Sequence, residues 1–217
     1  MIVRLCVFID YQNAYMRARD AFGDSSTGND FTFGQIFPRR LGVLLRQRSE
    51  DAGKTRELTE VRVYRGEPDA QRSPSGQAAC QRQVRFWNAQ GLVRAFTRSL
   101  DYRATAWTDG VPTQWEIREK GIDVMIAVDL VRGALNDEYD VAILMSADTD
   151  LLPAAEAVVD ARKWIEFAAW RPDVGYASHL RLNGQPSWCH HLRRPDFEVL
   201  SDPADYTKPI AGAPPTT

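Results

Sequence analysis

The sequence predicts an α/β fold, a three-layer sandwich in which helices cover both faces of a mainly parallel central sheet. Short apolar runs alternate along the chain with longer segments of helical periodicity, which is the pattern of a doubly wound sheet. The runs at residues 2–9 and 141–145 are apolar at nearly every position. Strands of a parallel sheet that are buried on both faces have this composition.

The first half of the chain supplies three of the expected strands. A loop composition, GDSSTGND, separates the first two helices, and Pro38 falls in the early turns of the second helix, where it can kink or delay it. Gly91 ends the third helix. In order, we expect a strand at 2–9, a helix at 11–22, a helix at 33–48 capped by Thr32, a strand at 59–65, a helix at 75–90 and a strand at 92–97.

In the second half of the chain, predicted strands and helices continue to alternate, and the pattern weakens toward the C-terminus. Residues 101–118 read either as a hairpin or as an excursion from the sheet. Residues 202–217 hold four prolines and show no periodicity, so we expect a domain at 1–200 and a disordered tail at 201–217. The remaining expected elements are a helix at 121–135, a strand at 141–145, a turn at 146–150, a helix at 151–162, a strand at 164–169, a short helix at 174–182 and an edge strand at 197–200.

The composition is that of a globular protein without a disulfide framework or a membrane span. The hydrophobic fraction of 44% and the charged fraction of 26% are ordinary for a globular domain, and three well-separated cysteines argue against a disulfide framework. No apolar run approaches the roughly 20 residues of a membrane span. The first apolar run is too short for a secretion signal and contains Arg4. We therefore expect a cytoplasmic protein without a membrane partner.

Acidic residues stand where the predicted strands end. Asp10 follows the strand 2–9, Asp148 and Asp150 follow the strand 141–145, and Asp123 opens the helix 121–135. Because parallel strands point the same way, Asp10, Asp148 and Asp150 should meet at one edge of the sheet. Clustered carboxylates raise one another's pKa unless a cation is present. The sequence therefore predicts a Mg²⁺ or Mn²⁺ site, since these ions prefer oxygen ligands.

Each acid also has a purely structural explanation. Asp148 can cap the following helix, and Asp150 and Asp123 suit the first turns of theirs, whereas capping explains Asp10 less well. Asp129 lies six residues after Asp123, well round the helix from it. We expect it to support the site indirectly, to lie on the helix surface or to belong to an interface.

Two other uses of an acidic strand end are disfavoured. A dinucleotide fold would need G-x-G-x-x-G after the first strand, but the sequence there is DYQNAY. A phosphatase that forms an aspartyl phosphate typically has a second acid two residues after its nucleophile, and that position holds Gln12.

Three ordered segments resemble the motifs of one known family. VFIDYQNAY resembles the first motif of NYN domains, EKGIDVMIAVDLV at 119–131 is similar to their second, and YDVAILMSADTDLLPAAEAV at 139–158 is similar to their third. Ala147 stands where the family usually has Gly, which leaves both neighbouring acids intact. The resemblance covers about residues 1–170, including the strand KWIEFAAW. It implies the Rossmann-like, PIN-like nuclease fold of LabA-type proteins.

The resemblance implies a metal-dependent endoribonuclease. The acidic pocket and its metal ligands would be Asp10, Asp123, Asp148 and Asp150, with Asn13 as an amide ligand or an orienting group. Lys120 matches the family's lysine. One or two metal ions can supply the nucleophilic water, the in-line geometry and the neutralised charge that phosphodiester hydrolysis needs.

An arginine-rich stretch could hold the nucleic acid. Residues 62–103 contain eight arginines, no lysine and three acids, a net charge of +5, and Arg binds phosphate with a planar fork. Aromatic residues among these charges could stack on unpaired bases, although Phe86 and Trp87 could equally be core residues of a helix. The candidate binding residues are Lys120, Arg65, Arg72, Arg82 and Arg85, and the aromatic ones are Phe86, Trp87, Tyr102 and Trp107.

Some alternatives stay open in the sequence. The segment Trp188-Cys189-His190-His191 lacks the paired spacing of a structural zinc site, so we expect an ordinary surface or core segment. A non-catalytic RNA-binding module with the same fold and a DNA or flap nuclease are both compatible with the motifs. We favour single-stranded RNA as the partner, and the oligomeric state, a homodimer included, stays undetermined.

Overall fold

The computed structural model describes residues 2–176, 179–182, 184 and 187–209, and it confirms the predicted α/β fold. A parallel sheet of six strands has the order β3-β2-β1-β6-β7-β8. The sheet order reverses direction between β1 and β6, which makes this pair the topological switch point. The strands are β1 (Val3–Asp10), β2 (Arg56–Glu67), β3 (Val93–Ser99), β6 (Val141–Met145), β7 (Trp164–Trp170) and β8 (Trp188–Leu192).

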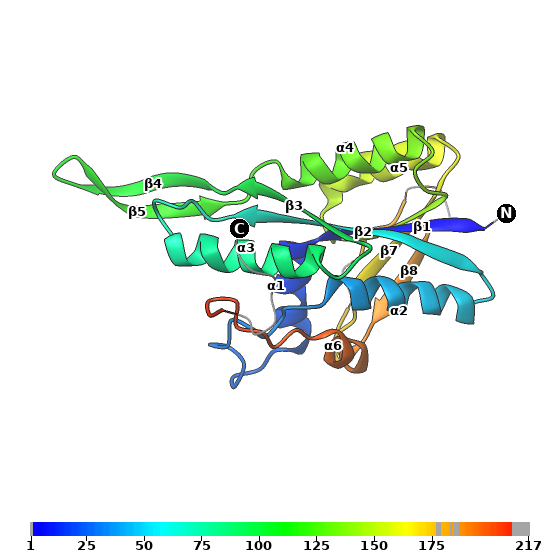
Figure 1. Ribbon diagram of the computed structural model, residues 1–217, viewed down its shortest axis with the longest axis horizontal. Coiled ribbons are helices and arrows are strands. Elements are labelled where there is room, and N and C mark those ends of the chain that lie inside the picture. The colour runs from blue at the N-terminus through cyan, green and yellow to red at the C-terminus, as the bar shows by residue number, and fades with distance from the viewer. Residues whose placement is uncertain (1, 177–178, 183, 185–186, 210–217) are drawn as a thin grey trace.

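Helices cover both faces of this sheet, as the three layers in Figure 1 show. Alternate residues of β1 serve the two faces: Leu5, Val7 and Ile9 pack into one core, and Cys6 and Phe8 into the other. The first core contains residues of α1 (Tyr11–Phe22), α2 (Pro38–Asp51), α3 (Pro74–Asn88) and α6 (Arg194–Leu200). The second contains residues of α4 (Ile122–Leu135), the 3₁₀ turn η1 (Thr149–Leu151) and α5 (Leu152–Asp160).

Residues 101–118 form a separate antiparallel hairpin, one of the two alternatives that the sequence left open. Strands β4 (Asp101–Thr108) and β5 (Val111–Arg118) pair with each other, and Figure 1 shows them extending away from the body of the molecule. Asp109 and Gly110 form the turn with φ values of 50° and 78°. Such two-residue turns require positive φ, which an Asp-Gly pair adopts readily.

The second helix begins later than predicted, at Pro38 instead of residue 33. The proline ring fixes φ at a helical value and lacks an N–H, which suits the first helical position. It also disfavours a helical conformation in the residue before it, and Phe37 is accordingly extended, with φ −83° and ψ 107°. The proline therefore starts this helix.

Two predictions near the C-terminus are wrong. Residues 197–200 belong to helix α6, because Pro195 occupies its first turn and the Asp196 carboxylate accepts the backbone N–H of Arg193. The edge strand is instead β8. The described residues of the predicted helix 174–182 are not helical, and Gly175 adopts a left-handed φ of 95° within it.

The segment after α6 contacts the domain as far as Thr207. Asp202 is buried and accepts the Tyr206 hydroxyl at 2.6 Å, and Arg82 donates to the carbonyl oxygens of Tyr206 and Thr207. Residues 210–217 lie outside the described residues, and the division into domain and tail stays a prediction. No helix in the described part of the chain is long and apolar enough to cross a membrane.

Candidate active site at the carboxyl ends of the strands

The topological switch point places the first and third acidic motifs side by side. Ile9 of β1 pairs with Met145 of β6, so Asp10 and Ser146 leave the sheet as neighbours. Ligands of open α/β sheets bind in this crevice, beyond the carboxyl ends of the strands. Asp10 therefore lies where the fold itself favours a binding site.

Asp10 is buried, with 4% of its surface exposed, and both carboxylate oxygens have partners. Oδ1 accepts the backbone N–H of Asn13 at 3.1 Å, and Oδ2 accepts the Ser146 hydroxyl at 3.0 Å. The first of these contacts makes Asp10 the N-cap of α1. The expectation that capping explains Asp10 poorly is therefore wrong, because one oxygen caps the helix and the other faces the turn after β6.

Further hydrogen bonds hold that turn against the start of α1. Asn13 Oδ1 accepts the N–H of Ala147 at 3.1 Å. Ser146 Oγ accepts the N–H of Asp148 at 3.1 Å, and Asp148 Oδ1 accepts the N–H of Asp150 at 2.9 Å. Asn13 and Ser146 thus fix the positions of the acids, and this contact supports the orienting role for Asn13 over that of a ligand.

The acids influence one another's ionisation. Burial raises the pKa of Asp10 to about 7, and the charges of Glu119 and Asp123 add to the effect. The pKa of Asp123, in the first turn of α4, is raised by burial and by the charges of Asp148 and Asp150. The four predicted acids are therefore linked by charge interactions through Asp123, with Asp148 half-buried and Asp150 exposed. We call these acids the acidic cluster.

Glu119 belongs to the same cluster, although the sequence prediction did not include it. Its Oε1 accepts the backbone N–H of Gly66, near the end of β2, at 2.6 Å. The residue as a whole is exposed, but partial desolvation of its carboxylate and the charge of Asp123 raise its pKa. A Cβ at Gly66 would lie 2.7 Å from the same oxygen, so only glycine leaves room for this contact. The available signal was its position in the second motif, two residues before Gly121.

The donor set of this cluster fits a hard divalent ion. Pairwise charge interactions link these five carboxylates, with Asp123 between Asp10 and Glu119 on one side and Asp148 and Asp150 on the other. Among the described residues, no three of the five lie close enough together to hold one ion as the side chains stand, so metal binding would require their carboxylates to move toward one another. Mg²⁺ and Mn²⁺ prefer oxygen ligands and would relieve the mutual repulsion. The ligands would come from Asp10, Glu119, Asp123, Asp148 and Asp150.

A cavity of about 180 Å³ opens beside the acids, between α1 and the ends of β6 and β7. Its lining is mostly apolar and includes Trp170 and Pro172, but it also contains Asn13, Arg17 and Ser146. The acidic cluster thus adjoins a pocket whose lining is mostly apolar.

The predicted basic residues fall into two groups. Arg65 bonds Gln83 and lies over the rings of Tyr11 and Trp87, and Arg82 holds the C-terminal segment. These two side chains are engaged within the protein. Arg72, Arg85 and Lys120 are exposed, and the Arg72 guanidinium lies 4.1 Å from the ring centre of Trp115 and 5.2 Å from that of Tyr102.

The aromatic residues separate in the same way. Trp87 is fully buried in the core, and Phe86 packs against Phe37 and Tyr206, as the core alternative required. Trp107 is 58% exposed on the hairpin. The sequence left the role of Asp129 open. Its side chain is buried and accepts the Tyr64 hydroxyl at 2.9 Å, so it binds a core residue on the side of the sheet that α4 covers.

A family model described as NYN domain matches residues 4–182, and the chain therefore belongs to the NYN domain family. This confirms the resemblance drawn from the three motifs and extends it past residue 170. The family and the architecture together define a nuclease-type α/β fold. No curated protein matches the chain at the significance applied.

Among solved structures, a protein of unknown function from Vibrio parahaemolyticus shares 17% identity over 77% of this chain and 81% of its own, with a TM-score of 0.47. A bacteriophage T5 flap endonuclease, solved with DNA and metal ions, shares 14% identity over 69% and 50%, with a TM-score of 0.29. The T5 5′-exonuclease with bound zinc gives the same identity and score over 68% and 50%. This chain spans half the length of both phage enzymes.

Proposed function

We propose that the protein is a Mg²⁺- or Mn²⁺-dependent endoribonuclease that hydrolyses phosphodiester bonds of single-stranded RNA. The observation that supports this proposal is the set of five acids, linked by charge interactions, beside the switch point between β1 and β6, in a chain of the NYN family. A structural role does not require so many interacting acids, since their mutual repulsion opposes folding.

The chain's own residues prepare this site before any substrate arrives. Asn13 and Ser146 fix the turn that carries Asp148 and Asp150, and the Gly66 N–H orients the carboxylate of Glu119. A bound divalent ion would neutralise phosphate charge and activate a water molecule. The exposed position of Asp150 leaves the outer side of the cluster open to a phosphodiester.

Single-stranded RNA is favoured as substrate by the surface of the hairpin. Trp107 is exposed there, and Arg72 lies against Trp115 and Tyr102. Aromatic rings can stack on unpaired bases, and arginines can bind the phosphates between them. In a duplex the bases are stacked on each other and do not offer their faces. The 2′-hydroxyl is not addressed by these contacts, so the preference for RNA over DNA needs its own test.

Asp148→Asn provides the test of catalysis. The amide oxygen can still accept the N–H of Asp150, so the turn should persist while a charged ligand is lost. Wild type and variant are compared on end-labelled single-stranded RNA with Mg²⁺, with Mn²⁺ and with a chelator. Asp160→Asn, an exposed acid at the end of α5, is the matched control. We expect cleavage by wild type and by the control to require metal. Cleavage by Asp148→Asn should be at least 100-fold slower than by wild type.

The same assay separates the alternatives. Equal cleavage by Asp148→Asn and wild type, or no cleavage by wild type with either metal, would refute the catalytic proposal. RNA binding without cleavage, and without metal uptake in calorimetry, would identify a non-catalytic RNA-binding module. Faster cleavage of DNA of the same sequence, or of a flap substrate, would assign the site to a DNA nuclease.

A further inference from the structure

Strand β8 presents two metal-binding side chains on one face. Successive side chains of a strand point to opposite faces, so Cys189 and His191 lie on the same side and His190 on the other. His190 is buried and contacts the Glu166 carboxylate at 2.9 Å, which commits it to the interior. Cys189 Sγ lies 4.0 Å from His191 Nδ1.

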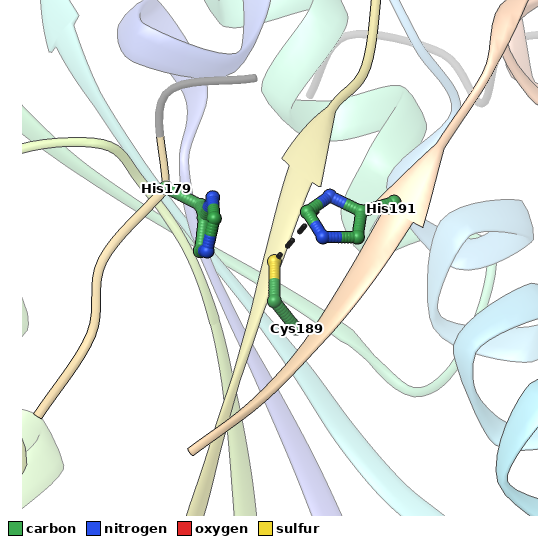
Figure 2. A group of neighbouring side chains, drawn as sticks. All are labelled: His179, Cys189 and His191. Carbon is green, nitrogen blue, oxygen red and sulfur yellow. Dashed lines mark hydrogen bonds between the residues drawn. The ribbon is translucent and has the colours of Figure 1, made fainter. Parts of the chain in front are cut away.

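A third such side chain comes from the connection between β7 and β8. Figure 2 shows His179 beside Cys189 and His191, with all three side chains directed toward a common point. One ligand atom from each residue lies within 4.8 Å of the other two. The rings of His179 and His191 meet edge to face, with their centres 5.0 Å apart. Among the described residues, this is the one group of three His, Cys, Asp or Glu side chains whose ligand atoms lie close enough to share an ion.

We propose that His179, Cys189 and His191 bind one Zn²⁺ ion. Two imidazole nitrogens and one thiolate suit zinc, which takes nitrogen and sulfur ligands in tetrahedral geometry, whereas Mg²⁺ and Mn²⁺ prefer oxygen. The three residues also line a cavity of about 390 Å³ together with Arg181, Leu182, Ser187 and Trp188. This cavity leaves room for a water molecule or another ligand at the fourth position.

Positive charges near the three side chains oppose a cation: Arg171, Arg181 and Arg193 all act on His191, and Arg181 also contacts a ligand directly. Its Nε donates to His179 Nε2 at 2.8 Å, so a zinc ion must either use the other ring nitrogen or displace the guanidinium. Because like charges repel, removal of this charge should strengthen zinc binding. A purely structural role of the three residues would not produce that gain.

The ion would fasten the connection after β7 to the last strand of the sheet. Within the described part of the chain, β8 pairs with β7 alone, so no described strand supports its outer edge. The site is three strands away from β1 in the sheet order, and its ligands are of another class than the carboxylates at the switch point. Zinc binding here is therefore independent of the proposed nuclease site.

The experiment uses the purified full chain after chelator treatment and Co²⁺ as a spectroscopic substitute for zinc. Cobalt bound to a thiolate gives a sulfur-to-metal charge-transfer band, which oxygen ligands do not produce. Zn²⁺ affinity follows from competition with a chromophoric chelator. The variants are Cys189→Ser, His179→Gln and Arg181→Gln. Cys80→Ala, a buried cysteine on α3, and Asp148→Asn serve as controls.

We expect the charge-transfer band to saturate at one thiolate-bound Co²⁺ per chain in wild type and in both controls, whether or not the carboxylates bind further Co²⁺. Cys189→Ser should lose the band and bind Zn²⁺ at least 100-fold more weakly, His179→Gln at least tenfold more weakly, and Arg181→Gln more tightly than wild type. Zn²⁺ should raise the melting temperature of wild type but not of Cys189→Ser. His179→Gln keeps the test valid if Cys189→Ser does not fold.

The proposal is overturned if wild type gives no charge-transfer band, or if His179→Gln binds Zn²⁺ as tightly as wild type. It is also overturned if the band disappears in Asp148→Asn. A chain that binds zinc as expected but cleaves no nucleic acid would support the zinc site while refuting the nuclease. The two proposals can therefore fail separately.

Discussion

Replacement of Asp10 by Asn should stabilise the metal-free protein at neutral pH. Asn has nearly the shape of Asp, and its amide oxygen can still accept the backbone N–H of Asn13. The change removes a carboxylate that is buried among other acids and whose pKa is raised to about 7. An ionised group in such surroundings opposes folding, since burial and like charges both disfavour the charged form.

The sign of the effect follows from proton binding. Between about pH 4 and pH 7 the folded chain retains the Asp10 proton, whereas the unfolded chain, with the ordinary pKa of 3.8, has lost it. The contribution of Asp10 to the free energy of unfolding of wild type therefore falls as pH rises through this window and is constant above it. The shift is about three units, and at about 1.4 kcal/mol per unit the total has an upper limit of about 4 kcal/mol. Loss of the Ser146 hydrogen bond would reduce the net gain by about 1 kcal/mol.

Urea unfolding of both proteins between pH 4 and pH 8.5, in the presence of a chelator, measures this difference. The stability of the Asn variant relative to wild type should increase up to about pH 7 and then stay constant. Addition of Mn²⁺ should reverse the order, because only wild type retains the full ligand set. Asp160→Asn is the exposed control. Parallel pH curves for wild type and Asp10→Asn would refute the buried, proton-binding role of Asp10.

Three further predictions concern other parts of the molecule. Glu119→Gln should lower metal-dependent cleavage at least tenfold while it changes the free energy of unfolding by less than about 1.5 kcal/mol, as assayed by RNA cleavage and urea unfolding. Glu166→Gln should destabilise the chain by about 3 kcal/mol, because it leaves the buried Arg56 without its charged partner. An unchanged urea midpoint would contradict this. Arg72→Ala should weaken binding of single-stranded RNA severalfold and reduce its salt dependence, with Arg85→Ala as a comparison. Equal affinity at low salt would show that the hairpin does not contact the nucleic acid.

Hydrophobic pattern alone determined the inner strands of the central sheet. β1, β6 and β7 are so apolar that burial on both faces is their main stable arrangement, and the direction of parallel strands then requires Asp10 and Asp148 to emerge at the same edge. The family resemblance could be recognised from the same segments, because they hold both the strands and the acids. In these segments the local sequence was therefore enough to predict where the acids lie in the fold.

The edge of the sheet was not predictable in this way. β8 contains two histidines in five residues, and its burial depends on a charged partner, Glu166, from another strand. The segment at 197–200 has a strand-like composition, but Pro195 and Asp196 in the preceding turn start a helix. At such positions, contacts with distant residues outweigh local propensity.

The acidic motifs and the buried strands, and with them the family and the place of the site, were determined by the sequence. Only the tertiary structure brought Glu119 to Gly66, committed Arg65 and Arg82 to internal contacts, and set His179 beside Cys189 and His191. The physical reason is that strand and helix patterns repeat over two to four residues and so can be read along the chain. Contacts across many residues leave no such repeat, because they depend on how the layers pack.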